Sequence, residues 1–125
     1  MKGEMEVENN ENMLQNGNNF FLIIVIVNKG FSDLVMEAAR KVGARGGTIL
    51  NARGTGKKEI EKHYGIVIHP DKELVLIVSK EDTKNNIMKE IYNECGLDSK
   101  AQGIIFSLKV DDVKGMSDEL RNIVD

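Results

Sequence analysis

The sequence is poor in residues that mark several large classes of protein. Its 125 residues include one cysteine, one proline, two histidines and no tryptophan. A single cysteine, Cys95, excludes a disulfide within the chain and is typical of a reducing compartment. With four phenylalanines, two tyrosines and a net charge of −3, the chain has few rings for stacking on bases and no overall attraction to phosphate backbones. We therefore expect no nucleic acid partner.

Long apolar runs are also absent. The longest one, residues 20–27, is much shorter than the roughly 20 residues that a membrane-spanning helix needs, so we expect no membrane insertion. The amino-terminal residues are acidic where a secretory signal would be basic. A hydrophobic content of 41% and a charged content of 30% are typical of one soluble globular domain. These features predict a cytoplasmic protein.

The character of the chain changes at about residue 20. Residues 1–19 hold six asparagines and four glutamates without apolar periodicity, so they cannot bury enough surface to offset the entropy of ordering. We predict a disordered N-terminal arm over residues 1–19 and a single domain over residues 20–125.

Apolar and β-branched runs predict four strands and two main helices in this domain. The strands are predicted at residues 20–27, 48–52, 73–78 and 104–110. The first predicted helix has Ser32 or Asp33 as its candidate N-cap and ends at Gly43. The second has Asp82 or Thr83 as its candidate N-cap and ends at Gly96. A short C-terminal helix is predicted after Gly115.

The order β-α-β-β-α-β is that of the ferredoxin-like α+β sandwich, an antiparallel sheet with both helices on one face. The strands at residues 20–27 and 73–78 are apolar at nearly every position, so both of their faces should be buried. The helices cover only one face of such a sheet. Packing against the sheets of other copies would bury the second face, and we predict a homotrimer.

Residues 43–56 are the most informative stretch, because they hold five glycines around an apolar strand. Glycine allows turns and the close approach of a ligand. The glycines lead into a charged segment, so we predict a loop excursion at residues 53–69, the kind of loop on which binding residues concentrate. Simple turns are the alternative, and the residue order of a P-loop is absent.

On these residues the chain resembles the PII nitrogen regulatory signalling proteins, in a PII-like branch. The resemblance covers about residues 20–116 and is most specific at residues 41–56, with further matches at Pro70 and residues 103–106. It implies a homotrimer that is not an enzyme, that senses a small effector in clefts between subunits, and that acts in nitrogen regulation. It also implies that the excursion is the T-loop, which docks on a transporter, enzyme or regulator.

The effector that the resemblance implies is an adenine nucleotide: ADP, AMP or ATP. The implied binding residues are Thr48, Gly54, Gly56, Lys58, Ile77, Gln102 and Gly103. In this resemblance, Thr48 and Ile77 match positions beside the adenine. Gly54 and Gly56 match the backbone near the phosphates.

Several phosphate-binding side chains of the family are replaced in this chain. Residues 101–104 stand where the family has Gly-Asp-Gly-Lys, and Gly115 and Ser117 stand in place of arginines. Lys58 replaces the glutamine that chelates magnesium. A bound polyphosphate needs cations or amides to compensate its charge, so ADP or AMP should be accommodated more easily than ATP with magnesium and 2-oxoglutarate, and we expect no metal. Candidate replacement cations are Lys58, Lys100 and Lys109.

Within the excursion, Lys57, Lys58 and His63 are the candidate contacts to a protein partner. Two other functions stay open. In one, His63, His69 and carboxylates of the excursion bind a divalent metal in a trimer that is similar to the CutA cation-tolerance proteins. In the other, a cleft between elements holds an active site, although no catalytic triad or carboxylate pair is visible in the sequence.

Overall fold

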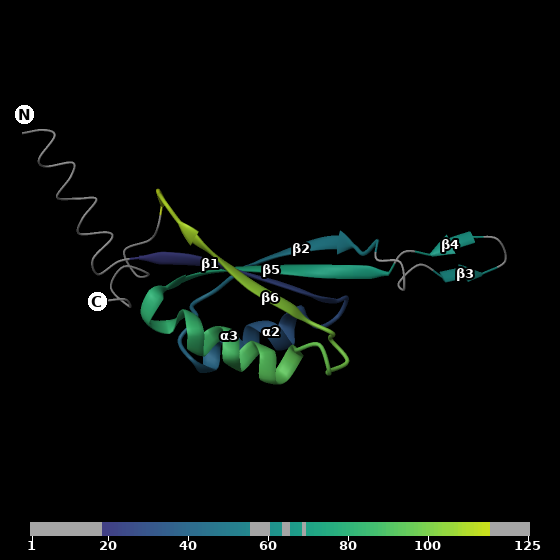
Figure 1. The fold of residues 1–125 in the computed structure, drawn as a ribbon, viewed down its shortest axis with the longest axis horizontal. Helices are drawn as coiled ribbons and strands as arrows, with labels where there is room; N and C mark the ends of the chain where they lie inside the picture. Colours follow the sequence, from purple (N-terminus) through teal and green to yellow (C-terminus); the bar gives the residue numbers. More distant parts are fainter. Residues whose placement is uncertain (1–18, 56–60, 64–65, 69, 116–125) are drawn as a thin grey trace, which may run out of the picture.

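The computed structural model describes residues 19–55, 61–63, 66–68 and 70–115. Its elements are β1 (Phe20–Asn28), α2 (Ser32–Lys41), β2 (Thr48–Arg53), β3 (Glu61–His63), β4 (Ile66–Ile68), β5 (Asp71–Lys80), α3 (Glu81–Cys95) and β6 (Ile104–Val110). Four strands form an antiparallel sheet in the order β2-β5-β1-β6, and β3 pairs with β4 in a separate hairpin (Figure 1). The predicted ferredoxin-like α+β fold is confirmed.

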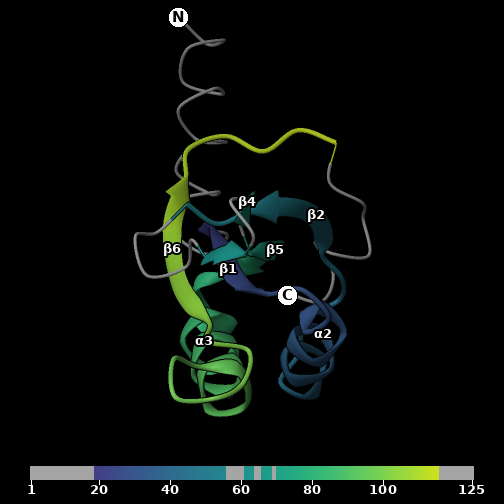
Figure 2. The same ribbon diagram turned by 90° about the vertical axis from the view of Figure 1, so that its right-hand side faces the viewer.

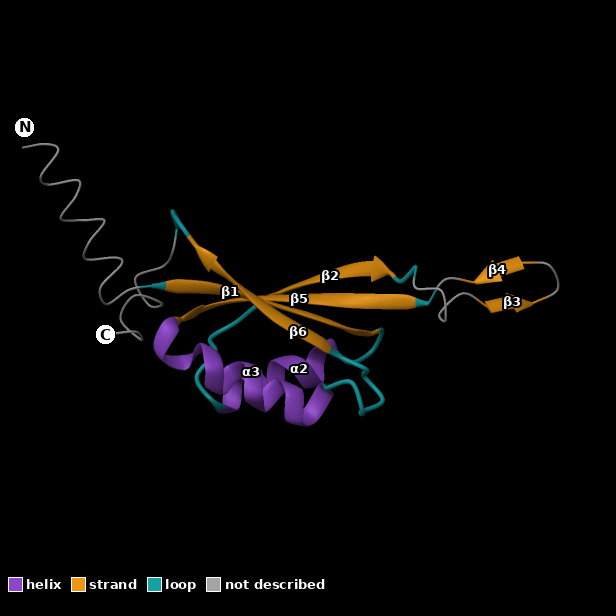
Figure 3. Cartoon of the chain, in the orientation of Figure 1, coloured by secondary structure: helices purple, strands orange, loops and turns teal. Residues whose placement is uncertain are grey.

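Both helices lie on the same face of the sheet (Figures 2 and 3). Their apolar sides meet alternate residues of β1 and β5, because side chains alternate across a strand. The core consists mainly of aliphatic side chains, and its fully buried members include Ile23, Val25, Val35, Ile77, Ile87 and Ile91. The helices therefore cover the sheet on one side only.

The opposite face of the sheet, here called the open face, is also apolar, and neither α2 nor α3 covers it. Cross-strand pairing aligns its side chains in rows. The apolar rows are Leu108–Leu22–Val78, Phe106–Ile24–Leu76–Thr48 and Ile104–Ile26–Leu74–Leu50. Of the eight large hydrophobic residues that are exposed in the described chain, five lie here: Leu50, Val78, Ile104, Phe106 and Leu108. Contiguous exposed apolar patches are typical of interaction surfaces.

The predicted helix ends are confirmed, but the predicted caps are wrong. Gly43 follows α2 with a φ of 108°, which glycine adopts without strain, and Gly96 is the C-cap of α3. The N-cap positions belong to Phe31 and Lys80, and neither helix has a side-chain cap hydrogen bond. For α2 the reason is tertiary, because a carboxylate from β5 takes the place of a local cap, as described below.

The excursion is partly a β-hairpin. The sequence predicted a loop over residues 53–69, whereas the structure has two short strands in it, β3 and β4. Figure 1 shows the hairpin beyond the end of β2 and β5, away from the helices. The predicted C-terminal helix and nearly all of the predicted N-terminal arm lie outside the described residues.

Candidate functional site

The base of the excursion is closed by backbone pairing at the end of the sheet. β2 and β5 remain paired up to Arg53 and Asp71. One residue further on, the Gly54 amide donates a hydrogen bond of 2.8 Å to the Pro70 carbonyl. The two ends of the excursion are thus held side by side.

The loop between α3 and β6, residues 96–103, is tightly shaped by its own backbone. The Ser99 amide donates to the Gly96 carbonyl, the Gln102 amide donates to the Ser99 carbonyl, and Gln102 adopts a positive φ of 49°. The Gly103 amide donates to the Cys95 carbonyl over 2.8 Å, and a Cβ on Gly103 would collide with that same carbonyl oxygen. Only glycine fits at residue 103, so the loop is fixed against the end of α3.

A polar row on the open face connects this loop to the base of the excursion. The Asn28 amide donates to the Ala101 carbonyl over 2.9 Å. The Asn28 side-chain nitrogen donates to the Lys100 carbonyl over 3.0 Å and lies 3.4 Å from Gln102 Oε1. Its Oδ1 accepts a 2.8 Å hydrogen bond from Lys72 Nζ. Asn28 and Lys72 are cross-strand partners, so this polar row continues the apolar rows toward the excursion.

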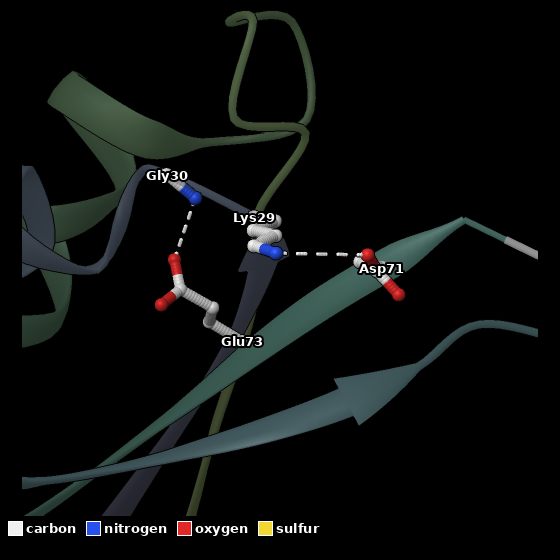
Figure 4. Close-up of polar contacts among 4 residues, drawn as sticks. All are labelled: Lys29, Gly30, Asp71 and Glu73. Atoms are coloured by element: carbon white, nitrogen blue, oxygen red, sulfur yellow. Dashed lines mark hydrogen bonds and ion pairs between the residues drawn. The ribbon is translucent and has the colours of Figure 1, made fainter.

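A carboxylate on the other side of β5 binds the start of α2 (Figure 4). Glu73 Oε1 accepts a 2.6 Å hydrogen bond from the Gly30 amide, and Oε2 accepts one of 3.1 Å from the Ser32 hydroxyl. The Gly30 amide is the main cause of a lowered pKa of Glu73. Desolvation, the next-largest effect, opposes it, and the hydroxyl and amide of Ser32 and the charge of Lys29 lower the pKa further. An anion at a helix N-terminus is favourable. Lys29 also forms an exposed ion pair with Asp71, at 3.8 Å.

The structure places the sequence-predicted site residues in two regions. Gly54, Gln102 and Gly103 lie at the excursion end of the sheet, the first half-buried, the second exposed and the third buried. Thr48 lies at the start of β2, exposed on the open face opposite Leu76, about 13 Å along the strand from the polar row. An elongated ligand is needed to span both regions.

Two features near Thr48 concern the predicted contact of Thr48 and Ile77 with the adenine ring. The Ile77 side chain is completely buried in the core. Beside it, a Cβ on Gly47 would be crowded, because it would lie 2.9 Å from Met36 Sδ, 3.0 Å from the Leu76 carbonyl oxygen and 3.2 Å from Ile77 Cγ1. Ile77 therefore packs in the core next to Gly47, and its contact with a ligand stays a prediction. Gly56 and Lys58 lie outside the described residues.

Metal binding receives no support from the described part of the chain. Among those residues, no three His, Cys, Asp or Glu side chains come together as metal ligands would. His69 lies outside them, and so does any ligand set that includes it. Among the described helices, none combines the length and the apolar content that crossing a bilayer requires.

Sequence reasoning missed three residues at the excursion end: Asn28, Lys72 and Glu73. The predicted first strand, residues 20–27, ends before Asn28. Lys72 lies outside the predicted strands, and Glu73 was only the first residue of the predicted third strand, residues 73–78. Their signal is that strands apolar at nearly every position turn polar at neighbouring ends. Register was needed to show that Asn28 and Lys72 face each other.

The ferredoxin-like sheet, its apolar open face and the hairpin beyond it define the fold class, and the comparisons identify the family. The sequence model of the family described as nitrogen regulatory protein P-II matches residues 20–119. The chain therefore belongs to the P-II family, whose members are signalling regulators and not enzymes. A search of curated proteins finds no significant match.

Solved structures of PII proteins resemble the chain. The PII protein of Arabidopsis thaliana bound to citrate has 26% sequence identity and a TM-score of 0.57, over 74% of this chain and 78% of that one. The GlnK–ATP complex of B. subtilis has 15% identity and a TM-score of 0.58, over 74% of this chain and 83% of that one. At 15% identity the second likeness supports the fold alone.

Proposed function

We propose that this PII-like regulator senses an adenine nucleotide in clefts between the subunits of a homotrimer and controls a partner protein through the excursion at residues 53–69. Membership of the P-II family supports the signalling role. Family membership alone does not include the bound nucleotide, the trimer, the partner protein or the link to nitrogen status, and we propose these four in addition.

One observation supports the proposal most. Loop 96–103 and the base of the excursion, far apart in the sequence, meet at one end of the sheet through hydrogen bonds of the Asn28 side chain. A ligand bound at this end contacts the loop and the excursion together. Its differential affinity for two arrangements of the excursion then sets the largest change in partner binding that it can cause.

The exposed apolar side chains of the open face favour assembly into the proposed trimer. Its three apolar rows would expose leucine, isoleucine and phenylalanine side chains to water in a single chain. Sheets of neighbouring copies that pack over these rows would remove that surface from water, which is favourable by about 25 cal/mol per Å² of apolar area. The polar row at Asn28 would then lie at the rim of the interface, where the clefts are.

The expected ligand is a nucleotide of low charge. Similar folds are bound to ATP in B. subtilis GlnK and to citrate in the Arabidopsis PII protein, so anionic effectors are the class to test. Residues 101–104 carry no cation, and Lys72, which lies close to this loop, already donates to Asn28. Because each phosphate removed from water needs compensation, we expect ADP or AMP to bind more tightly than ATP.

Isothermal titration calorimetry with AMP, ADP, ATP and citrate tests the proposal. We expect saturable binding of at least one adenine nucleotide with one site per chain, weakened at least about tenfold in Thr48→Val, which removes the hydroxyl and keeps the shape. Thr83→Val is the matched control, since Thr83 lies on α3 away from both regions. Absence of binding by all three nucleotides at millimolar concentration would remove the proposed effector and leave the fold intact.

A further inference from the structure

We infer that Asn28 is a positioning residue that couples loop 96–103 to the base of the excursion within one chain. The inference rests on the proposed function for its biological meaning, because it assigns a route by which an effector at the loop would act on the excursion. The contacts themselves are independent of any ligand.

The two ends of the Asn28 side chain serve different segments. The side-chain nitrogen Nδ2 donates to the Lys100 carbonyl and lies near Gln102 Oε1, and both of these acceptors are in the loop. The amide oxygen accepts from Lys72 Nζ, on the strand that leads into the excursion. An amide can donate and accept at once, so one side chain joins two segments that have no hydrogen-bonded strand pairing with each other.

The route continues from Lys72 into the excursion. Lys72 is the second residue of β5 and pairs with Ala52 of β2. The preceding Asp71 carbonyl accepts from the Lys29 amide over 3.2 Å, and the Pro70 carbonyl accepts from the Gly54 amide. A displacement of Lys72 is thus carried by the backbone to the closed base of the loop.

The loop is suited to transmit displacement because it has little freedom of its own. Gly103 is fixed against α3, and turns within the loop hold Ser99 and Gln102. A ligand that pushes on this loop therefore moves it as a unit, and the movement reaches Asn28 through its hydrogen bond to the Lys100 carbonyl. Coupling between sites is carried by contiguous packed and hydrogen-bonded groups of this kind.

Amide hydrogen exchange in the full chain, without ligand, tests the coupling with two selective variants. Asn28→Asp keeps the acceptor for Lys72 and removes the donor to the loop. Lys72→Met keeps the aliphatic stem and removes the donor to Asn28. We expect each variant to raise exchange on both sides, at the Gln102 amide and at the Gly54 amide, by about fivefold, the factor that one net hydrogen bond is worth. Lys72→Arg, which retains a donor, should restore slow exchange.

Two control variants cut bonds that do not pass through Asn28. Ser99→Ala removes the hydroxyl that donates to the Gly96 carbonyl, and Lys29→Met removes the ion pair with Asp71. Ser99→Ala should raise amide exchange only in the loop, and Lys29→Met should raise it only at the base of the excursion. The amide of Val25, in the core, should stay protected in all variants and shows that they fold. If Asn28→Asp speeds exchange only in the loop and Lys72→Met only at the excursion base, the coupling is refuted.

A second arm separates this inference from the proposed function. At saturating ADP, the wild-type chain should show slowed exchange at Gly54, and Lys72→Met should lose most of that change. A wild-type chain that binds no nucleotide contradicts the proposed effector, while the exchange of the free protein still decides the coupling. A nucleotide response at Gly54 that is unchanged in Lys72→Met contradicts the coupling and leaves the proposed effector in place.

Discussion

At the scale of single residues, Gly103 is the position with the least room for change. We predict that Gly103→Ala lowers the free energy of unfolding by about 2 kcal/mol or more, because the added methyl group collides with the Cys95 carbonyl and forces the loop off α3. Chemical denaturation measures the loss. Gly46→Ala is the matched control, since a Cβ at Gly46 meets nothing within 4 Å. Equal stability of the two variants would contradict the tight fit.

Glu73 should make stability depend on pH. Its pKa is lowered in the folded chain, mainly by the Gly30 amide, so its contribution is fully present above the unfolded value of about 4.3 and is lost as pH falls through the lower folded value. We predict that Glu73→Gln destabilises the protein by about 1 kcal/mol at pH 7. The difference from wild type should shrink below about pH 4.

Thermal denaturation of both proteins between pH 3 and 7 measures this difference. Glu37→Gln changes an exposed carboxylate of α2 and serves as the control. A wild-type minus Glu73→Gln difference that stays constant with pH would show that the carboxylate does not hold the start of α2.

Cys95 should be an inert thiol. Burial raises its pKa, and Glu94 adds a smaller effect in the same direction. Because the thiolate is the reactive form, we predict that the folded protein reacts with a thiol reagent at least about a hundredfold more slowly than the chain unfolded in denaturant. Rapid labelling under native conditions would place Cys95 outside the core.

At the scale of elements, the sequence predicted the strands well because their apolar runs are long and continuous. The predicted ranges 104–110 and 48–52 differ from β6 and β2 by at most one residue. The charged β3 was missed because it shows no apolar alternation. The predicted cap of α2 was wrong because Glu73, 41 residues from Ser32, stabilises the start of that helix through tertiary contact, and no local pattern contains that information. The predicted cap of α3 was also wrong, since Lys80 occupies the N-cap position.

The site was only partly predictable for the same reason. Glycine spacing pointed to the closed base at Gly54 and to the turn before β6. The link between them depends on the register that places Asn28 opposite Lys72, which is a property of the folded sheet. The adenine contacts of Thr48 and Ile77 came from the family resemblance, and they stay predictions.

At the scale of the whole molecule, the open face decides whether clefts between subunits exist. We predict that Leu76→Glu, in the middle apolar row, yields a monomer, because three copies of a buried carboxylate would have to leave water together. Leu97→Glu is the control: Leu97 is also exposed, at 62%, but it belongs to the loop after α3. That variant should keep the wild-type mass.

Multi-angle light scattering of the wild-type protein tests the central claim most directly, since every proposed cleft needs neighbouring copies. We predict a particle of about three times the 13.9 kDa chain mass at micromolar concentration. A particle of 13.9 kDa, with the same mass for Leu76→Glu, would contradict an account in which the open face joins the subunits.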